Sequence, residues 1–169
     1  MLTIATNVVP GEFAAKLKAV AGVGFDAIDL SLTDVAQFDG SPYDLAALVA
    51  DAGLKIASLG PIAAGASPAM VEANATTAKA LGADLLILAV DGDLPKDLPA
   101  RDGVRVALRP SRRAEDAVIA FVKDQNDPVI GLALNAFDVL GDGSRPARLR
   151  DLDGTSVFHV ALWDGPITP

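Results

Sequence analysis

Few residues of this chain have side chains that could do chemistry in a folded interior. The single histidine, His159, lies in the apolar run 156–162 and could act as an acid or base near neutral pH. Arg105 and Arg109 lie in and beside another apolar run, where a guanidinium could bind carboxylate or phosphate with two parallel hydrogen bonds. The chain has no cysteine, which excludes disulfides, thiolate nucleophiles and cysteine-based metal sites. It also has no P-loop and no Gly-x-Ser-x-Gly motif.

The composition limits the classes of protein to which the chain could belong. Its 169 residues, of which 51% are hydrophobic, can form one domain with a buried core, and we predict a single domain over residues 1–169. The net charge of -8, from 14 basic and 22 acidic residues, argues against binding to nucleic acid or to an anionic membrane. The sequence has no signal-like start and no long uninterrupted apolar run, so we expect a cytoplasmic protein.

Predicted helices that end at a glycine and are followed at once by an apolar strand recur along the chain. Gly24, Gly53 and Gly82 follow one another at intervals of 29 residues, and glycine suits the left-handed conformation that ends a helix. The predicted strands cover residues 2–6, 27–32, 55–59, 85–90, 104–108, 129–134 and 156–162. Ser41 and Ser67, each followed by a proline, are typical helix N-caps, and a further helix is predicted over residues 113–124.

This alternation predicts an α/β fold, namely an incomplete (β/α)8 TIM-type barrel with about seven mainly parallel strands. The interval of 21 residues between Gly82 and Gly103 leaves no room for a helix after the fourth strand, and an eighth strand is lacking. A complete barrel typically needs about 250 residues. Because native proteins pair or cover their sheet edges, we expect a homodimer or higher oligomer formed through the open barrel edges.

Five segments, spread over nearly the whole chain, carry a resemblance to a known family. They are residues 21–30 (AGVGFDAIDL), 38–42 (FDGSP), 80–86 (ALGADLL), 131–140 (GLALNAFDVL) and 157–164 (VFHVALWD). The chain resembles the sugar phosphate isomerases/epimerases, which are xylose-isomerase-like TIM barrels, and among them it is most similar to the 3-dehydroshikimate dehydratases. The resemblance implies a TIM barrel with a divalent metal at the carboxyl ends of its strands, where the metal polarises a hydroxy-ketone-type substrate.

Every metal-ligand position of the family that can be aligned is changed in this chain. The family's glutamate at the end of the fifth strand matches Arg109, its aspartate and histidine on the sixth match Asn135 and Asp138, and its glutamine on the seventh matches Ala161. An arginine in the centre of a divalent site would repel the metal by roughly several kcal/mol. We therefore predict no metal site, no other cofactor, and loss of the family's metal-dependent reaction.

The same alignment predicts which strand residues face the barrel axis, because side chains alternate along a strand. The predicted interior holds Asp29, Ser31, Arg105, Arg109, Asn135 and His159. The two arginines could bind a small anionic metabolite; alternatively, Arg105 forms a buried pair with Asp29, and Arg109 fills the place of the lost metal. His159 is either an acid–base residue or a core histidine whose hydrogen bonds are satisfied.

Two further aspartates, Asp138 and Asp164, lie at or just past strand ends, where barrels build their active sites, although loop aspartates are often merely solvated. The favoured function is metal-free binding of a small anionic metabolite. Its predicted binding residues are Arg105, Arg109, Asn135 and Asp164. One alternative is an active isomerase, epimerase or lyase. Its acid–base residues would be Asp29, Asp138 and His159. Another is a homo-oligomeric assembly protein whose open barrel edge is the functional surface.

Overall fold

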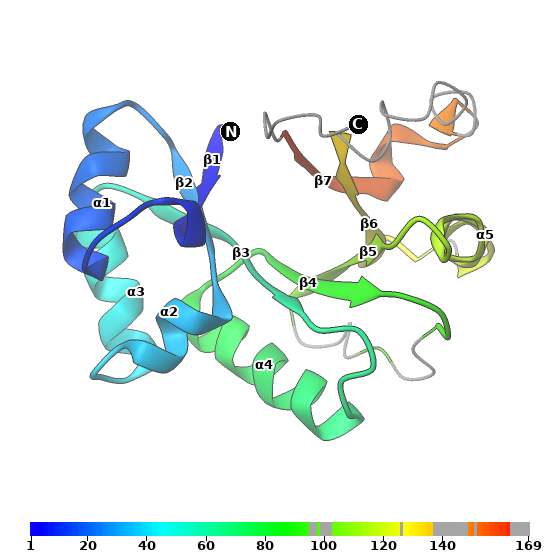
Figure 1. The fold of residues 1–169 in the computed structure, drawn as a ribbon, viewed down its shortest axis with the longest axis horizontal. Helices are drawn as coiled ribbons and strands as arrows, with labels where there is room; N and C mark the ends of the chain where they lie inside the picture. The colour runs from blue at the N-terminus through cyan, green and yellow to red at the C-terminus, as the bar shows by residue number, and fades with distance from the viewer. Residues whose placement is uncertain (95–97, 99–102, 126, 137–148, 151, 163–169) are drawn as a thin grey trace.

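Seven parallel strands form a single sheet that curls into an open half-barrel (Figure 1). The computed structural model describes residues 1–94, 98, 103–125, 127–136, 149–150 and 152–162. The strands follow the chain order and are β1 (Thr3–Ala5), β2 (Ala27–Leu30), β3 (Lys55–Ile62), β4 (Leu85–Val90), β5 (Arg105–Pro110), β6 (Ile130–Asn135) and β7 (Val157–Ala161). All neighbouring strands are parallel. The predicted α/β fold, an incomplete TIM-type barrel of seven strands, is confirmed.

Helices cover the outer, convex face of this sheet (Figure 1). They are α1 (Phe13–Gly22), α2 (Leu32–Gln37), α3 (Pro42–Asp51), α4 (Pro68–Leu81) and α5 (Glu115–Gln125). Between β4 and β5, the described residues 91–94, 98 and 103–104 contain no helix, in line with the short interval in the sequence. In the parts of the chain that the structure describes, no helix has the length and apolar character needed to cross a membrane.

The predicted helix ends are largely confirmed. Ser41 and Asp44 form a capping box at the start of α3, in which each side chain is bonded to the other residue's backbone N–H. The Ser67 hydroxyl accepts a hydrogen bond from the Met70 N–H at the start of α4. Gly82 ends α4 with a φ of 67°, in the left-handed region that glycine adopts without strain. These local signals determine where α3, between β2 and β3, begins and where α4, between β3 and β4, begins and ends.

The chain after β2 differs from the prediction. A strand was expected to continue to residue 32, but β2 ends at Leu30 and α2 begins at Leu32. The Ser31 hydroxyl accepts a hydrogen bond from the Asp34 N–H at 3.0 Å and so caps α2. Ser31 thus begins a helix rather than extending a strand into the barrel interior.

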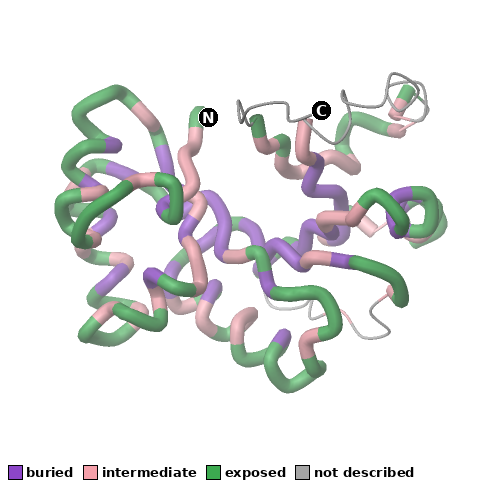
Figure 2. Tube along the Cα trace, in the orientation of Figure 1, coloured by how far each residue is buried: buried purple, intermediate pink, exposed green. Residues whose placement is uncertain are grey.

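Two separate apolar clusters lie on the two faces of the sheet. The larger one packs the outward side chains of the strands, such as Leu86, Leu108 and Leu132, against the helices. The smaller one lines the barrel interior. It consists of Leu85, Ile87, Ala107 and Ala133, with Phe158 packed against them. Figure 2 shows the buried segments concentrated along the strands. The predicted alternation between outward and inward residues on β5 and β6 is therefore confirmed.

The outer face of β7 is less well covered than that of the central strands. Val160 and Leu162 have exposed fractions of 53% and 83%. In the described residues no strand pairs with the outer edge of β7, and β1 occupies the other end of the sheet. Self-association through these edges stays a prediction.

Candidate functional site

An aspartate on the interior side of β2 lies at the centre of a polar network. Asp29 Oδ2 accepts a hydrogen bond from Thr3 Oγ1 at 2.6 Å and lies 3.2 Å from His159 Nε2. Asp29 Oδ1 accepts a hydrogen bond from Ser58 Oγ at 2.7 Å. We call Thr3, Asp29, Ser58 and His159 the interior network. It joins β1, β2 and β3 to β7, so two of the predicted acid–base residues, 130 positions apart, are in contact.

The network keeps its carboxylate ionised although the group is largely buried. Burial raises the pKa of Asp29, but hydrogen bonds from His159, Thr3 and Ser58, together with the charge of His159, outweigh it, and the pKa lies below its ordinary value. The side chains of Asp29 and His159 are 15% and 16% exposed. Asp29 is therefore an ionised hydrogen-bond acceptor at neutral pH, and its side chain is mostly but not fully buried.

Sequence reasoning missed Thr3 and Ser58. Ser58 reaches Asp29 because the ladder between β2 and β3 shifts its register: Ile28 pairs with Ile56, but Asp29 pairs with Ser58. Strict alternation would place Ala57 opposite Asp29 instead. Thr3 pairs with Ala27, which shares the inward face of β2 with Asp29. The pairing register between β1 and β2 would therefore have placed Thr3 beside Asp29.

Arg105 begins β5 and lies at the amino end of the barrel interior. Its guanidinium carbon lies 4.8 Å from the centroid of the Phe158 ring, a cation–π contact. That ring packs tightly over Gly131, because a Cβ at Gly131 would lie 2.8 Å from it. The partners of Asp29 are Thr3, Ser58 and His159. The alternative of a buried Arg105–Asp29 pair is therefore wrong.

Arg109 lies near the carboxyl end of the same strand. It shares the inward face of β5 with Ala107 and is half-buried. Four residues along a strand span about 13 Å, so Arg105 and Arg109 start from opposite ends of the interior. Among the described residues, no carboxylate forms an ion pair with Arg109. Arg109 is thus the arginine at the end of the barrel where active sites are built.

The acid that follows the neighbouring strand β4 pairs with Arg113 and not with Arg109. Asp91 directly follows β4, whose Ala89 pairs with Arg109. Its carboxylate accepts a hydrogen bond from Arg113 Nε at 2.7 Å and a second one from Arg113 Nη2. This paired guanidinium, rather than that of Arg109, lowers the pKa of Asp91 from its ordinary value.

The donors at the carboxyl ends of β5, β6 and β7 do not fit the divalent metal that the resemblance implies. The matching inward positions are Arg109, Asn135 and Ala161, which supply one cation, one amide and one methyl group. Divalent metals in such sites need carboxylate or imidazole ligands. In the described part of the chain, no group of three or more His, Asp or Glu side chains gathers to hold a metal ion. The predicted residues Asp138 and Asp164 lie outside the described residues.

A second buried carboxylate, which the sequence analysis did not single out, lies at the carboxyl ends of β1 and β2. Lys16 Nζ is 2.7 Å from Asp34 Oδ1, and Ser31 Oγ donates to Asp34 Oδ2 at 2.8 Å. Thr6 Oγ1 accepts a hydrogen bond from the Ser31 N–H at 3.0 Å. Burial raises the pKa of Asp34, but hydrogen bonds from Lys16, Thr6 and Ser31 lower it below its ordinary value. We call Thr6, Lys16, Ser31 and Asp34 the helix-end cluster.

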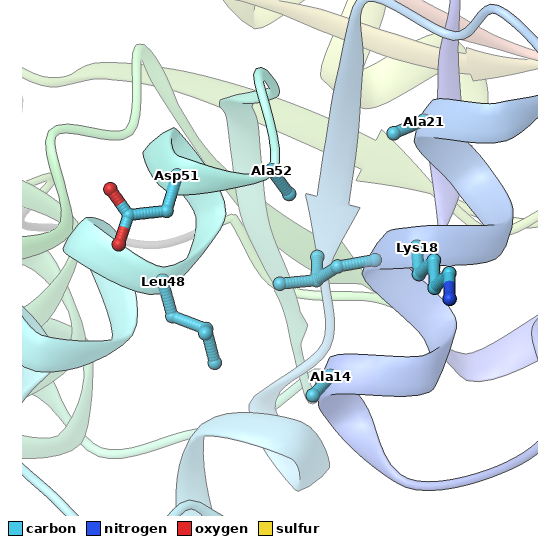
Figure 3. A pocket seen from close by; sticks show the side chains of 7 residues that line it. Ala14, Lys18, Ala21, Leu48, Asp51 and Ala52 are labelled. Atoms are coloured by element: carbon cyan, nitrogen blue, oxygen red, sulfur yellow. The ribbon is translucent and has the colours of Figure 1, made fainter.

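A shallow cavity of about 340 Å³ lies between α1 and α3, in the outer layer (Figure 3). It is lined by Ala14, Leu17, Lys18, Ala21, Leu48, Asp51 and Ala52. Its apolar walls are alanine and leucine side chains, and its two charged residues, Lys18 and Asp51, are exposed. It is separate from the barrel interior and from both polar clusters.

Comparison with known proteins agrees with this architecture. No protein-family model matches the chain. The chain is 28% identical over 194 aligned positions to a 3-dehydroshikimate dehydratase of Pseudomonas aeruginosa and 27% identical to one of Pseudomonas putida. Each alignment covers 98% of this chain, which spans only 31% of the length of these relatives.

Solved structures resemble the chain in fold. A xylose isomerase-like TIM barrel/4-hydroxyphenylpyruvate dioxygenase fusion protein has a TM-score of 0.83 at 23% identity, over 98% of this chain and 31% of its own. The IOLI protein, whose structure has a bound zinc atom, has a TM-score of 0.77 at 17% identity, over 96% of this chain and 72% of its own. The resemblance to the xylose-isomerase-like sugar phosphate isomerase/epimerase barrels, expected from the sequence, is thereby confirmed.

Proposed function

We propose that this chain binds a small anionic metabolite at the carboxyl end of its barrel interior and does so without a divalent metal. The observation that carries the proposal is Arg109. Its guanidinium starts from the inward face of β5, where the resemblance places a metal-binding glutamate, and no described carboxylate pairs with it. A half-buried guanidinium that no described carboxylate pairs with is suited to bind carboxylate or phosphate.

The residue at the end of the next strand supports this location. Asn135 ends β6, is half-buried, and pairs with Ala161 of β7. A side-chain amide offers both a donor and an acceptor for the hydroxyl or carbonyl groups of a polar ligand. Arg109 would therefore bind the charged group of the metabolite, and Asn135 would bind an uncharged polar group.

The anion site can be tested by thermal unfolding with inorganic phosphate and, separately, with citrate. A ligand at 100 times its dissociation constant adds about 2.7 kcal/mol to the folded state. We expect one of these anions to stabilise the wild-type protein and Arg109→Ala to remove the effect. Arg112→Ala is the matched control, because Arg112 is an exposed arginine three residues further on. If Arg109→Ala keeps the full stabilisation, Arg109 is not the anion receptor.

A second candidate is a metal-independent isomerase or lyase, and the contact between Asp29 and His159 favours it. A histidine held by a carboxylate can accept and return a proton near neutral pH. This candidate predicts turnover of 3-dehydroshikimate, the substrate in the name of the curated relatives, in the presence of a metal chelator. His159→Ala would abolish that turnover, whereas Asp51→Ala, in the outer layer, would leave it unchanged. Binding without turnover would favour the first candidate.

A further inference from the structure

Hydrogen-bond donors surround the carboxylate of Asp29 on three sides. Thr3 Oγ1 and His159 Nε2 meet Oδ2, at 2.6 and 3.2 Å, and Ser58 Oγ meets Oδ1 at 2.7 Å. An ionised carboxylate can only accept hydrogen bonds, so each of these groups must direct a hydrogen toward Asp29. For the imidazole, this requires that Nε2 carries the proton.

The position of that proton determines the chemistry of the other ring nitrogen. A neutral imidazole has one N–H and one lone pair, so a ring protonated at Nε2 has its lone pair on Nδ1. Among the described residues, His159 Nδ1 has no hydrogen-bond partner, so its lone pair is not taken up by a described donor. With 16% of its side chain exposed, His159 is sheltered from bulk water but still reachable.

The donors on Asp29 come from three different strands, which fixes the carboxylate in place. Thr3 lies on β1 and Ser58 on β3, on either side of the β2 residue that they hold. With both carboxylate oxygens engaged by neighbouring strands, Asp29 presents a fixed acceptor to β7. The hydrogen bond to this fixed acceptor directs Nε2 of the imidazole at Asp29, as in sites where a buried carboxylate orients a catalytic histidine.

We infer that the interior network is a proton-transfer site in which Asp29 holds His159 as the Nε2–H tautomer and leaves Nδ1 as the proton acceptor. Thr3 and Ser58 are positioning residues for Asp29. The inference rests on the proposed function only for the molecule that supplies the proton, a small anionic metabolite with an acidic O–H or a C–H next to a carbonyl.

The proton balance needs no further reactant. When the bond to hydrogen in the metabolite breaks, its electron pair stays on the metabolite and the proton forms a bond with Nδ1. The ring becomes imidazolium, and its positive charge is balanced by the Asp29 carboxylate. In the reverse direction Nδ1 returns the proton to the metabolite or to water.

The tautomer can be measured directly, because His159 is the only histidine in the chain. Long-range ¹H–¹⁵N correlation on the full-length protein, at a pH where the ring is neutral, assigns the protonated nitrogen. We expect a single Nε2–H tautomer in the wild-type protein and a mixture in Asp29→Asn. Asp34→Asn is the matched control, because it makes the same chemical change in the helix-end cluster and should leave the tautomer unchanged. Wild-type protein with the proton on Nδ1, or an even mixture, would overturn the inference without any variant.

The accessibility of Nδ1 is tested with diethyl pyrocarbonate, which acylates unprotonated imidazole. We expect the native protein to be modified, with His159→Ala as the blank for the histidine signal. Modification only after unfolding in urea would overturn the inference, because Nδ1 would then be closed to any reactant.

The two proposals can fail separately. If phosphate and citrate do not bind while the Nε2–H tautomer is fixed and Nδ1 reacts, the anion site is wrong and the proton-transfer site stands. If an anion binds through Arg109 while the tautomer is mixed, the anion site stands and the proton-transfer site is wrong.

Discussion

The interior network and the helix-end cluster are built from similar groups but differ in what they can do. Each has one aspartate, two hydroxyl side chains and one nitrogen base, and in each the pKa of the aspartate is lowered by hydrogen bonds that outweigh burial. In the helix-end cluster the base is Lys16, which can only donate hydrogen bonds. In the interior network the base is His159, which can both donate and accept. The former is suited to stability, and only the latter is suited to proton transfer.

The two clusters also differ in how far apart their members are in the sequence. The members of the helix-end cluster all lie within residues 6–34, and they connect the ends of β1 and β2 to α1 and α2. Asp29 and His159 are 130 residues apart and meet only because the sheet curls. The interior network therefore depends on the complete curl of the sheet, whereas the helix-end cluster depends on local structure.

The largest effect is expected from breaking the more deeply buried pair. Asp34→Ala leaves Lys16 without its partner at a side chain that is 13% exposed, and it removes the acceptor of the hydrogen bond from Ser31 Oγ. We expect the free energy of unfolding to fall by about 3 kcal/mol, measured by urea denaturation. The His159 tautomer should not change. A loss below about 1 kcal/mol would place this pair with ordinary surface ion pairs.

A smaller loss is expected in the interior network. Asp29→Ala removes the acceptor for Thr3, Ser58 and His159, but the two hydroxyls can rotate and the imidazole can change its tautomer. We expect the free energy of unfolding to fall by about 2 kcal/mol in the same urea experiment. If Asp29→Ala costs more than Asp34→Ala, the interior network is the main structural pair, and the comparison is reversed.

Acid should weaken both clusters. Because the pKa of each aspartate is lower in the folded protein than in the unfolded chain, each contributes stability above its unfolded value of about 3.9. This contribution is lost as the pH falls through the folded pKa. We expect unfolding free energies measured by urea denaturation between about pH 5 and pH 3 to fall less steeply in Asp29→Asn and Asp34→Asn than in wild type. Identical slopes in all three proteins would contradict the lowered pKa values.

The smallest effect is expected from removing a single hydroxyl of the interior network. Ser58→Ala takes away one donor, and the other oxygen of Asp29 keeps its contacts with Thr3 and His159. We expect a loss of about 1 kcal/mol in thermal unfolding and a partial shift of the His159 tautomer. Ser67→Ala, which removes a helix cap of similar strength, is the control and should change stability alone.

Much of the fold could be predicted because its signals are local. The apolar run 85–90 predicts β4, Gly82 marks the end of α4, and Ser41 marks the start of α3. The prediction for the residues after β2 was wrong because it too relied on a local signal. Ser31 and Asp34 have the spacing of a helix cap, but the apolar Leu32 between them also fits a continued strand, and the capping hydrogen bond decides the outcome.

The site could be predicted only in part, because its contacts depend on register and curl. Alternation on β5 placed Arg109 inward with Ala107. Alternation could not predict whether Arg105 and Asp29 are in contact, because the distance between β5 and β2 depends on how strongly the sheet curls. Ser58 was missed because a register shift between β2 and β3 moves it to the inward side. No residue type in the sequence predicts that shift.

The measurement that tests the central claim most directly is thermal unfolding of the wild-type protein in excess Mn²⁺, Mg²⁺ or Zn²⁺. An interior whose carboxyl end presents Arg109 in place of a metal ligand should not bind these ions, so we predict no change in the unfolding temperature. A specifically bound metal at 100 times its dissociation constant would instead add about 2.7 kcal/mol. A shift of that size, removed by Asp138→Ala, would contradict the account and make metal-dependent catalysis the better explanation of this barrel.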